Sequence, residues 1–81
     1  MTIRDQVRNF ILTNFLFTDD QSKLEDGQSL MQSGAVDSTG IMELILFVDQ
    51  TFGVTVEDDE MVPENLDSVD NVVAFLERKQ A

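Results

Sequence analysis

Cysteine, histidine, tryptophan and tyrosine are all absent from the 81 residues of this chain. Without cysteine and histidine, the chain cannot supply a disulfide, a zinc or haem site of the usual ligands, or a cysteine nucleophile. A Ser-His-Asp triad is excluded for the same reason. The sequence therefore predicts a protein that is not an enzyme by itself, because the side chains of most common catalytic machinery are missing.

Positive charge is also scarce. Five Lys and Arg face 16 Asp and Glu, which gives a formal net charge of -11. No cation lies between Lys23 and Arg78, and that stretch holds thirteen carboxylates, from Glu25 to Glu77. Such a chain repels phosphate backbones and anionic lipids, so it favours basic protein partners and disfavours nucleic acid.

Long apolar runs are missing too. No segment reaches the roughly 18 apolar residues of a membrane span, and the N-terminus lacks the pattern of a secretion signal. We therefore expect a cytoplasmic protein without membrane insertion. Leu, Ile, Val and Phe still make up 27 of the 81 residues, enough to predict one folded domain over residues 1–81. We expect it to be a monomer.

Apolar residues recur at helical spacing in three segments. The first helix is predicted from residue 3 to about 14, behind a capping pattern that starts at Thr2. A long loop follows to about Asp37. A second helix begins at Asp37 or Ser38 and ends at Gly53, a residue suited to a left-handed C-terminal position. Its predicted buried stripe is Ile41, Leu44, Ile45, Val48 and Phe52.

The C-terminal third predicts one helical turn and one further helix. Residues 57–61 can form a short turn, and Pro63 disfavours helix at Val62. Asp67 or Ser68 caps the last helix, whose predicted stripe is Val69, Val72, Val73 and Leu76. The predicted fold is a small all-α antiparallel four-helix bundle of three main helices and one short helix, with a long loop between helices one and two.

The sequence lacks the motifs of common phosphate-binding and calcium-binding loops. No lysine follows a glycine-rich phosphate loop. A calcium loop starting at Asp19 would have Leu24 where the sharp turn needs glycine and Leu30 where a bidentate Glu belongs. The acidic run at residues 57–60 either collects divalent cations loosely or forms a solvated helix start.

Ser38 remains as the residue of interest, because it lies at the expected start of the second helix behind Asp37. The free amides and positive dipole end of a helix N-terminus favour an anion there, so a phosphodiester on the Ser38 hydroxyl would be stabilised. The alternative is that Asp37 or Ser38 only caps the helix, or that Ser38 is a phosphorylation site.

The same helix has a second face. Rotation by 100° per residue places Met42, Glu43, Leu46 and Phe47 off the buried stripe. Exposed Met and Leu beside acidic groups suggest a docking face, and Glu43 with Asp49 would steer a basic partner to it. The alternative is that another segment of the chain covers these apolar side chains.

Short motifs spread over nearly the whole chain resemble those of the acyl carrier protein family. They are Val36-Asp37-Ser38, Glu43-Leu44-Ile45, Phe52-Gly53-Val54 and Leu66-Asp67-Ser68-Val69. The resemblance implies that a carrier protein synthase, a phosphopantetheinyl transferase, attaches 4'-phosphopantetheine from coenzyme A to Ser38. It implies that Asp37 is the adjacent acid that helps the synthase and its magnesium engage. It also implies docking roles for Met42, Glu43 and Leu46.

The resemblance further implies a carrier that holds acyl intermediates as thioesters on the attached arm. It would deliver them to acyl-ligase, ketosynthase or acyltransferase enzymes with basic docking patches, in fatty acid, polyketide or related acyl or aminoacyl biosynthesis. Thr39 and Gly40 depart from the family pattern, and Gly40 is predicted to loosen the first helical turn. The alternative function is a small acidic adaptor without a prosthetic group. If the carried chain is sheltered between the helices, the expected lining is Ile41, Ile45, Val48, Met61, Leu66 and Val73.

Overall fold

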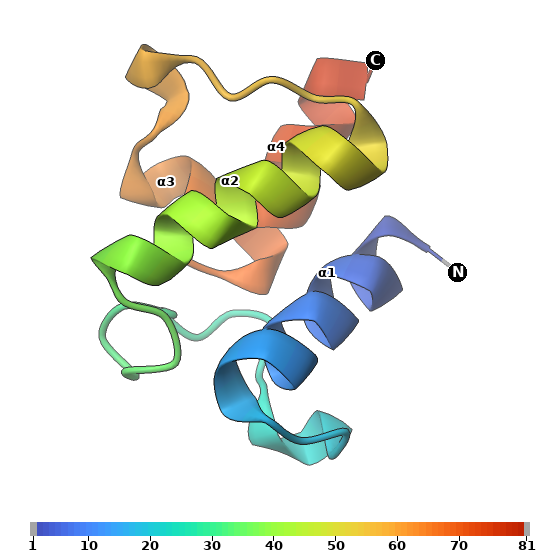
Figure 1. Ribbon diagram of the computed structural model, residues 1–81, viewed down its shortest axis with the longest axis vertical. Helices are drawn as coiled ribbons and strands as arrows, with labels where there is room; N and C mark the ends of the chain where they lie inside the picture. Colours follow the sequence, from blue (N-terminus) through green and yellow to red (C-terminus); the bar gives the residue numbers. More distant parts are fainter. Residues whose placement is uncertain (1, 81) are drawn as a thin grey trace.

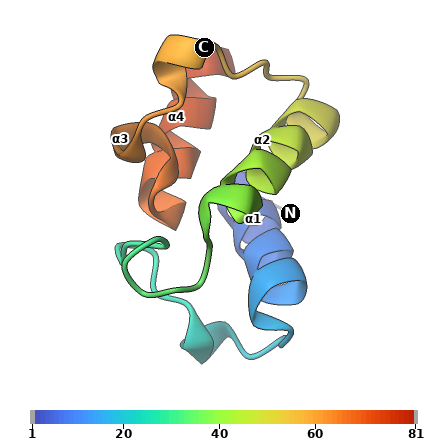
Figure 2. The same ribbon diagram turned by 60° about the vertical axis from the view of Figure 1, so that its left-hand side comes forward.

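The computed structural model describes residues 2–80, and that part of the chain is helical without a β-strand. Figure 1 and the turned view of Figure 2 show α1 running in the opposite sense to α2. This arrangement confirms the predicted all-α fold with a long loop between the first two main helices. The elements in chain order are α1 (Ile3–Ile11), η1 (Leu12–Leu16), η2 (Gln21–Lys23), α2 (Ser38–Phe52), η3 (Asp58–Glu60), α3 (Pro63–Leu66) and α4 (Val69–Gln80).

The first helix begins as predicted, but only its part up to Ile11 is α-helical. The Thr2 hydroxyl accepts a hydrogen bond from the Asp5 amide at 3.0 Å, which caps α1. The predicted end near residue 14 lies inside η1, a wider π-helical turn that continues the chain from Leu12 to Leu16 and that the sequence did not predict. Phe17 then takes a left-handed conformation with φ 54°, and the Thr18 amide donates to the Leu12 carbonyl at 3.1 Å. The extra turn keeps the apolar residues before Phe17 on the core.

Both predicted ends of α2 are confirmed. One Asp37 carboxylate oxygen accepts a hydrogen bond from the Gly40 amide at 2.7 Å. At the other end Gly53 has φ 67°, a left-handed conformation that glycine adopts at low cost, and its amide donates to the Asp49 carbonyl at 2.9 Å. The α2 helix therefore starts and stops on local signals in the sequence.

The connection from α2 to α4 contains one element that the sequence pattern did not predict. The predicted turn in residues 57–61 is the 3-10 turn η3, and Val62 is extended as expected before a proline. The short helix of the fold is α3, which begins at Pro63 itself. Proline suits the first helical position because the amide it lacks would have no partner there.

A serine caps the last helix. The Ser68 hydroxyl accepts a hydrogen bond from the Asn71 amide at 3.0 Å, so Ser68 is the cap of α4 and Asp67 is not. Asp67 instead fastens the long loop. Its carboxylate accepts from the Ser29 hydroxyl at 2.6 Å and from the Met31 amide at 2.9 Å. These bonds hold the loop that leads into α2.

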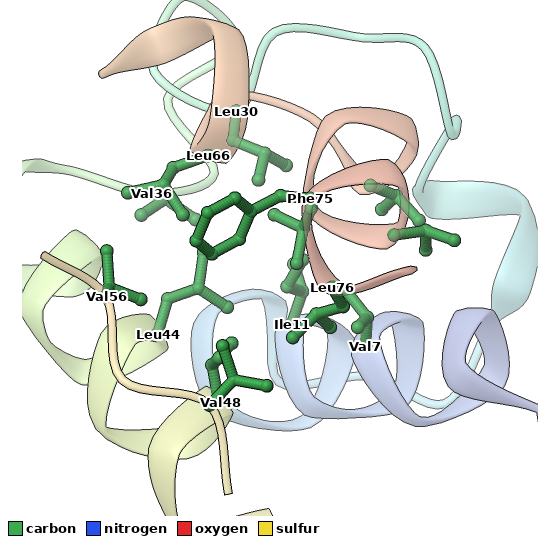
Figure 3. Packing of buried hydrophobic residues seen from close by; sticks show 14 of the residues in the cluster. Val7, Ile11, Leu30, Val36, Leu44, Val48, Val56, Leu66, Phe75 and Leu76 are labelled. Atoms are coloured by element: carbon green, nitrogen blue, oxygen red, sulfur yellow. The ribbon is translucent and has the colours of Figure 1, made fainter. Parts of the chain in front are cut away.

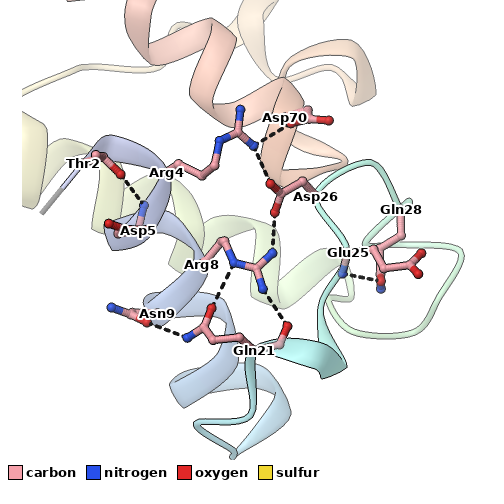
Figure 4. Close-up of polar contacts among 10 residues, drawn as sticks. All are labelled: Thr2, Arg4, Asp5, Arg8, Asn9, Gln21, Glu25, Asp26, Gln28 and Asp70. Atoms are coloured by element: carbon pink, nitrogen blue, oxygen red, sulfur yellow. Dashed lines mark hydrogen bonds and ion pairs between the residues drawn. The ribbon is translucent and has the colours of Figure 1, made fainter.

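A second polar cluster fastens the start of the same loop (Figure 4). One Arg4 guanidinium nitrogen contacts Asp26 at 2.8 Å and Asp70 at 2.6 Å. Arg8 also pairs with Asp26 and bonds to Gln21. Asp26 therefore joins α1 to the loop, and Arg4 joins both to the start of α4.

The core lies where α1, α2, α4 and the long loop meet (Figure 3). The Phe75 ring is at its centre, between Leu30 and Leu66 on one side and Leu44 on the other. The predicted buried stripe of α4 did not include Phe75. The buried face of this helix is wider than the stripe, because the surrounding segments cover more of it. The buried apolar residues are Val7, Ile11, Leu12, Leu24, Leu30, Val36, Leu44, Val48, Val54, Val56, Leu66, Val69, Val72, Val73, Phe75 and Leu76.

Within residues 2–80, none of the helices combines the length and the apolar character that crossing a bilayer requires. The cytoplasmic location stays a prediction from the sequence.

Candidate functional site

The N-terminus of α2 presents Ser38 at the surface. Asp37 is the residue that caps this helix, through its bond to the Gly40 amide. The alternative that Ser38 is the cap is therefore wrong, and its hydroxyl is left out of the capping interaction. Ser38 is exposed, and helix geometry leaves the amides of Ser38 and Thr39 without acceptors inside α2. An anion attached to the Ser38 oxygen would lie where these amides and the helix dipole favour it.

An apolar pocket opens directly beside Ser38. Its volume is about 230 Å³. Of the residues predicted to shelter a carried chain, three line it and three do not. Ile41, Met61 and Leu66 do, whereas Ile45, Val48 and Val73 belong to the core or its edge. The sequence pattern missed other lining residues because they lie in loops or at the ends of the four-residue helix α3, where no periodicity can be recognised. These are Met31, Val62, Pro63 and Asp67.

The predicted docking face of α2 is mostly free. Met42 and Leu46 are 54% and 56% exposed, and Glu43 and Asp49 are exposed as well. Phe47 differs, because its ring stacks on the Phe10 ring of α1 with centroids 4.1 Å apart. Phe47 is thus half-buried and joins α2 to α1, as expected for a residue beside the buried stripe, and its docking role stays a prediction.

The comparison with known proteins decides the family. A curated acyl carrier protein from Exiguobacterium sibiricum is 34% identical over 58 residues, which are 72% of this chain and 71% of that protein. The chain belongs to the acyl carrier protein family. As a member of that family it is a carrier and not an enzyme. No family model matches the chain.

Solved structures share the fold of this carrier protein. The solution structure of a holo acyl carrier protein from Nitrosomonas europaea matches with a TM-score of 0.77, over 99% of this chain and 98% of that one, at 24% identity. A chain from a crystal structure named for an FAD-dependent dehydrogenase matches with a TM-score of 0.74 at 27% identity. That match covers 86% of this chain and 97% of the other.

The described ion pairs of this carrier protein lie away from the predicted docking face of α2. Arg4 and Arg8 pair with Asp26 near the start of α4, and Lys79 pairs with Glu60 at 3.0 Å. The carboxylates of α2 therefore keep their negative charge uncompensated in the described part of the chain. This charge is suited to attracting a basic partner surface.

The acidic run at residues 57–60 is a helix start. The Glu60 carboxylate accepts a hydrogen bond from the Glu57 amide at 3.0 Å, and the Glu60 amide donates to the Glu57 carbonyl at 2.9 Å, so both residues close the turn η3. The Glu57 amide and the Lys79 ammonium, both bonded to the Glu60 carboxylate, lower the pKa of that group. In residues 2–80 no three Asp or Glu side chains gather in an arrangement that could hold a metal ion. The structure therefore supports the solvated helix start.

Gly40 departs from the family pattern and allows a close packing contact that the sequence did not predict. A Cβ atom at Gly40 would lie 2.9 Å from Cε1 of Phe15 and 2.9 Å from Cγ1 of Val36. The Phe15 ring, brought in by the π-helical turn, therefore packs against the bare backbone of the first turn of α2. This contact holds the turn that the sequence predicted to be loose.

We expect Gly40→Ala to lower the free energy of unfolding by about 1 kcal/mol, measured by urea denaturation. Alanine normally gains about 1 kcal/mol over glycine in a helix, but overpacking costs about 1 to 3 kcal/mol. Gly27→Ala is the matched control, because its Cβ would make an ordinary contact at 3.8 Å. Adding Phe15→Leu should restore part of the loss, and a stabilised Gly40→Ala protein would contradict the packing argument.

Proposed function

We propose that this carrier protein receives 4'-phosphopantetheine on the Ser38 hydroxyl and carries acyl groups for partner enzymes. The observation that supports this most directly is the exposed Ser38 at the head of α2, released from capping by the Asp37 bond to Gly40. When attached, the group supplies a terminal thiol that holds an acyl group as a thioester. Residues 1–81 act as one carrier domain.

In the attachment step, the Ser38 oxygen forms a bond to one phosphorus atom of coenzyme A. This is the atom of the diphosphate to which the pantetheine is attached. The serine proton is lost, and the bond to the bridging oxygen of the diphosphate breaks. The nucleotide half of coenzyme A leaves with that oxygen. The chain contributes position and charge here: Asp37 orders the turn and is the acid adjacent to Ser38, and the amides of Ser38 and Thr39 favour the new phosphodiester.

The α2 face supports the proposed partners. Glu43 and Asp49 would steer basic surfaces of the synthase and of acyl-ligase, ketosynthase or acyltransferase enzymes. Met42 and Leu46 would provide adaptable apolar contact after the encounter. The pathway would be fatty acid, polyketide or related acyl or aminoacyl biosynthesis.

The test is to incubate the purified protein with coenzyme A, magnesium and a broad-specificity carrier synthase, and then to weigh the product. We expect one phosphopantetheinyl mass gain per chain, which fragmentation maps to the peptide that carries Ser38. A gain mapped to another serine, such as the exposed Ser33 of the preceding loop, would overturn the assignment. An unchanged mass would favour the adaptor without a prosthetic group.

A further inference from the structure

Phe17 is the most exposed large apolar side chain in residues 2–80, with 83% of its surface free. We propose that Phe17 and Asp19 form a docking contact separate from the α2 face, and that this contact takes an arginine side chain from the carrier synthase that acts on Ser38. The inference rests on the proposed function, because that function brings the synthase to the Ser38 end of the molecule.

The backbone at Phe17 does not favour a phenylalanine. Its φ is 54°, and it is the one non-glycine residue with a positive φ in the part of the chain that the structure describes. This conformation ends η1, where the amides of Phe17 and Thr18 both donate to the Leu12 carbonyl. Glycine or asparagine adopts it at a lower cost than a bulky residue does. The exposed ring adds little to the core, so the fold does not explain it, and strain of this kind indicates a role in binding.

Phe17 lies at the same end of the molecule as Ser38. Because α1 and α2 run in opposite senses, η1 ends beside the start of α2 (Figures 1 and 2). The Phe15 ring makes this contact, since a Cβ atom at Gly40 would lie 2.9 Å from its Cε1. Phe17 is two residues from Phe15, and Ser38 is two residues from that glycine. An enzyme that reaches the Ser38 hydroxyl therefore comes close to the exposed ring.

The surroundings of the ring suit a guanidinium group. Phe17 and Asp19 line a shallow groove together with Thr13 and Thr18. Asp19 is exposed, and it takes part in none of the ion pairs described in residues 2–80. An arginine can stack on the face of a phenyl ring and donate hydrogen bonds to a carboxylate with the same group.

The segment after the groove keeps a negative charge. The Asp20 carboxylate accepts hydrogen bonds from the Ser22 hydroxyl at 2.6 Å and from the Ser22 amide at 3.0 Å. These bonds lower the pKa of Asp20, so the group stays ionised at neutral pH. Lys23 offsets one of the two carboxylates at positions 19 and 20, which leaves a net charge of one negative unit on this segment.

The net charge of the whole chain selects among possible occupants of the groove. A second copy would bring a further charge of -11, and an anionic lipid surface would also be repelled. A basic protein surface is attracted instead. Among basic partners, the synthase is the one that must reach Ser38 itself.

The experiment measures the kinetics of phosphopantetheinyl transfer by the carrier synthase of the same organism. We expect Phe17→Asn to raise KM by about 5- to 10-fold and to leave kcat within about 2-fold, because the contact holds the ground state and the transition state alike. Phe17→Tyr keeps the ring face and should keep the KM. Asp19→Asn should raise KM by about 2- to 5-fold and weaken its dependence on salt.

Two controls separate binding from folding. Asparagine relieves the left-handed strain, so Phe17→Asn should melt about 2 to 5 °C above the unsubstituted protein. Thr55→Asn changes an exposed residue after α2 and should leave KM unchanged. An unchanged KM for Phe17→Asn, or an equal rise for Phe17→Tyr, would overturn the proposal. A lower Tm for Phe17→Asn would also overturn it, because the ring would then serve the fold.

Binding can also be followed without transfer. In a titration of the Ser38→Ala protein with the same synthase, the ring proton signals of Phe17 should shift, and signals that ignore the synthase would contradict the contact. If the groove instead binds a second copy, the unsubstituted protein alone should sediment as a dimer and Phe17→Asn as a monomer. That result would overturn the choice of partner.

Failure of the inference and failure of the proposed function give different results. An unsubstituted protein that gains no phosphopantetheinyl mass fails the proposed function. A protein that gains this mass with the same KM before and after Phe17→Asn is a carrier whose synthase does not use the groove.

Discussion

Ser38→Ala is expected to abolish the phosphopantetheinyl mass gain completely while leaving the free energy of unfolding within about 0.5 kcal/mol of the unsubstituted protein. The loss is complete because the hydroxyl oxygen is the atom to which the group would be joined. The stability is kept because Ser38 is exposed and the capping bond to Gly40 comes from Asp37. Mass spectrometry and urea denaturation of the same preparation measure both quantities.

Two control variants separate the chemistry from the fold. Ser33→Ala changes an exposed serine five residues earlier and should keep the mass gain. Asp37→Ala removes the cap and should cost about 1 kcal/mol of stability. If the protein is instead an adaptor without a prosthetic group, incubation with the synthase should leave the mass of both proteins unchanged. Partner binding should then be the same in the unsubstituted protein and in Ser38→Ala. A Ser38→Ala protein that still gains the group would contradict the proposed attachment site.

The sequence was sufficient where local signals determine structure. The pair Asp37 and Ser38 marked the start of α2 and Gly53 its end, because a side-chain cap and a left-handed glycine act within one helical turn. Ser38 could be singled out for the same reason, since its place depends only on that cap. Met42 and Leu46 could be placed outward from helical periodicity alone.

Residues whose role depends on a distant partner could not be placed in this way. Asp67 matched a cap by its position before α4, yet its carboxylate bonds to the loop at Ser29 and Met31. Phe47 was predicted only to lie off the buried stripe, and its stacking on the Phe10 ring of α1 could not be foreseen. In each case the deciding contact joins segments far apart in the chain, and the helical period carries no information about it.

The Gly40 contact illustrates the same limit at the site itself. Read locally, a glycine in the first turn of α2 weakens the helix. In the fold, the absent side chain makes room for the Phe15 ring. That ring arrives there through η1, a π-helical turn that the periodicity of the first helix did not predict.

Phe75→Ala is expected to lower the free energy of unfolding by about 4 kcal/mol, the usual cost of removing a buried phenyl ring and leaving a cavity. Phe75 is 2% exposed, and Figure 3 shows its ring at the meeting point of α2, α4 and the long loop. A domain of 81 residues has a total stability of about 4 to 12 kcal/mol. The substitution should therefore remove a large part of it, as the midpoint of urea denaturation will show.

Phe17→Ala is the matched control, because it makes the same chemical change on a side chain that is 83% exposed. We expect its free energy of unfolding to change by less than about 0.5 kcal/mol. The contrast between the two substitutions tests whether the buried Phe75 ring is needed for core packing. Leu66 lines the pocket and lies close to the Phe75 ring in Figure 3, so a Phe75→Ala protein that still folds should lose packing next to the pocket. Equal losses for the two substitutions would show that the ring of Phe75 is not the centre of the core.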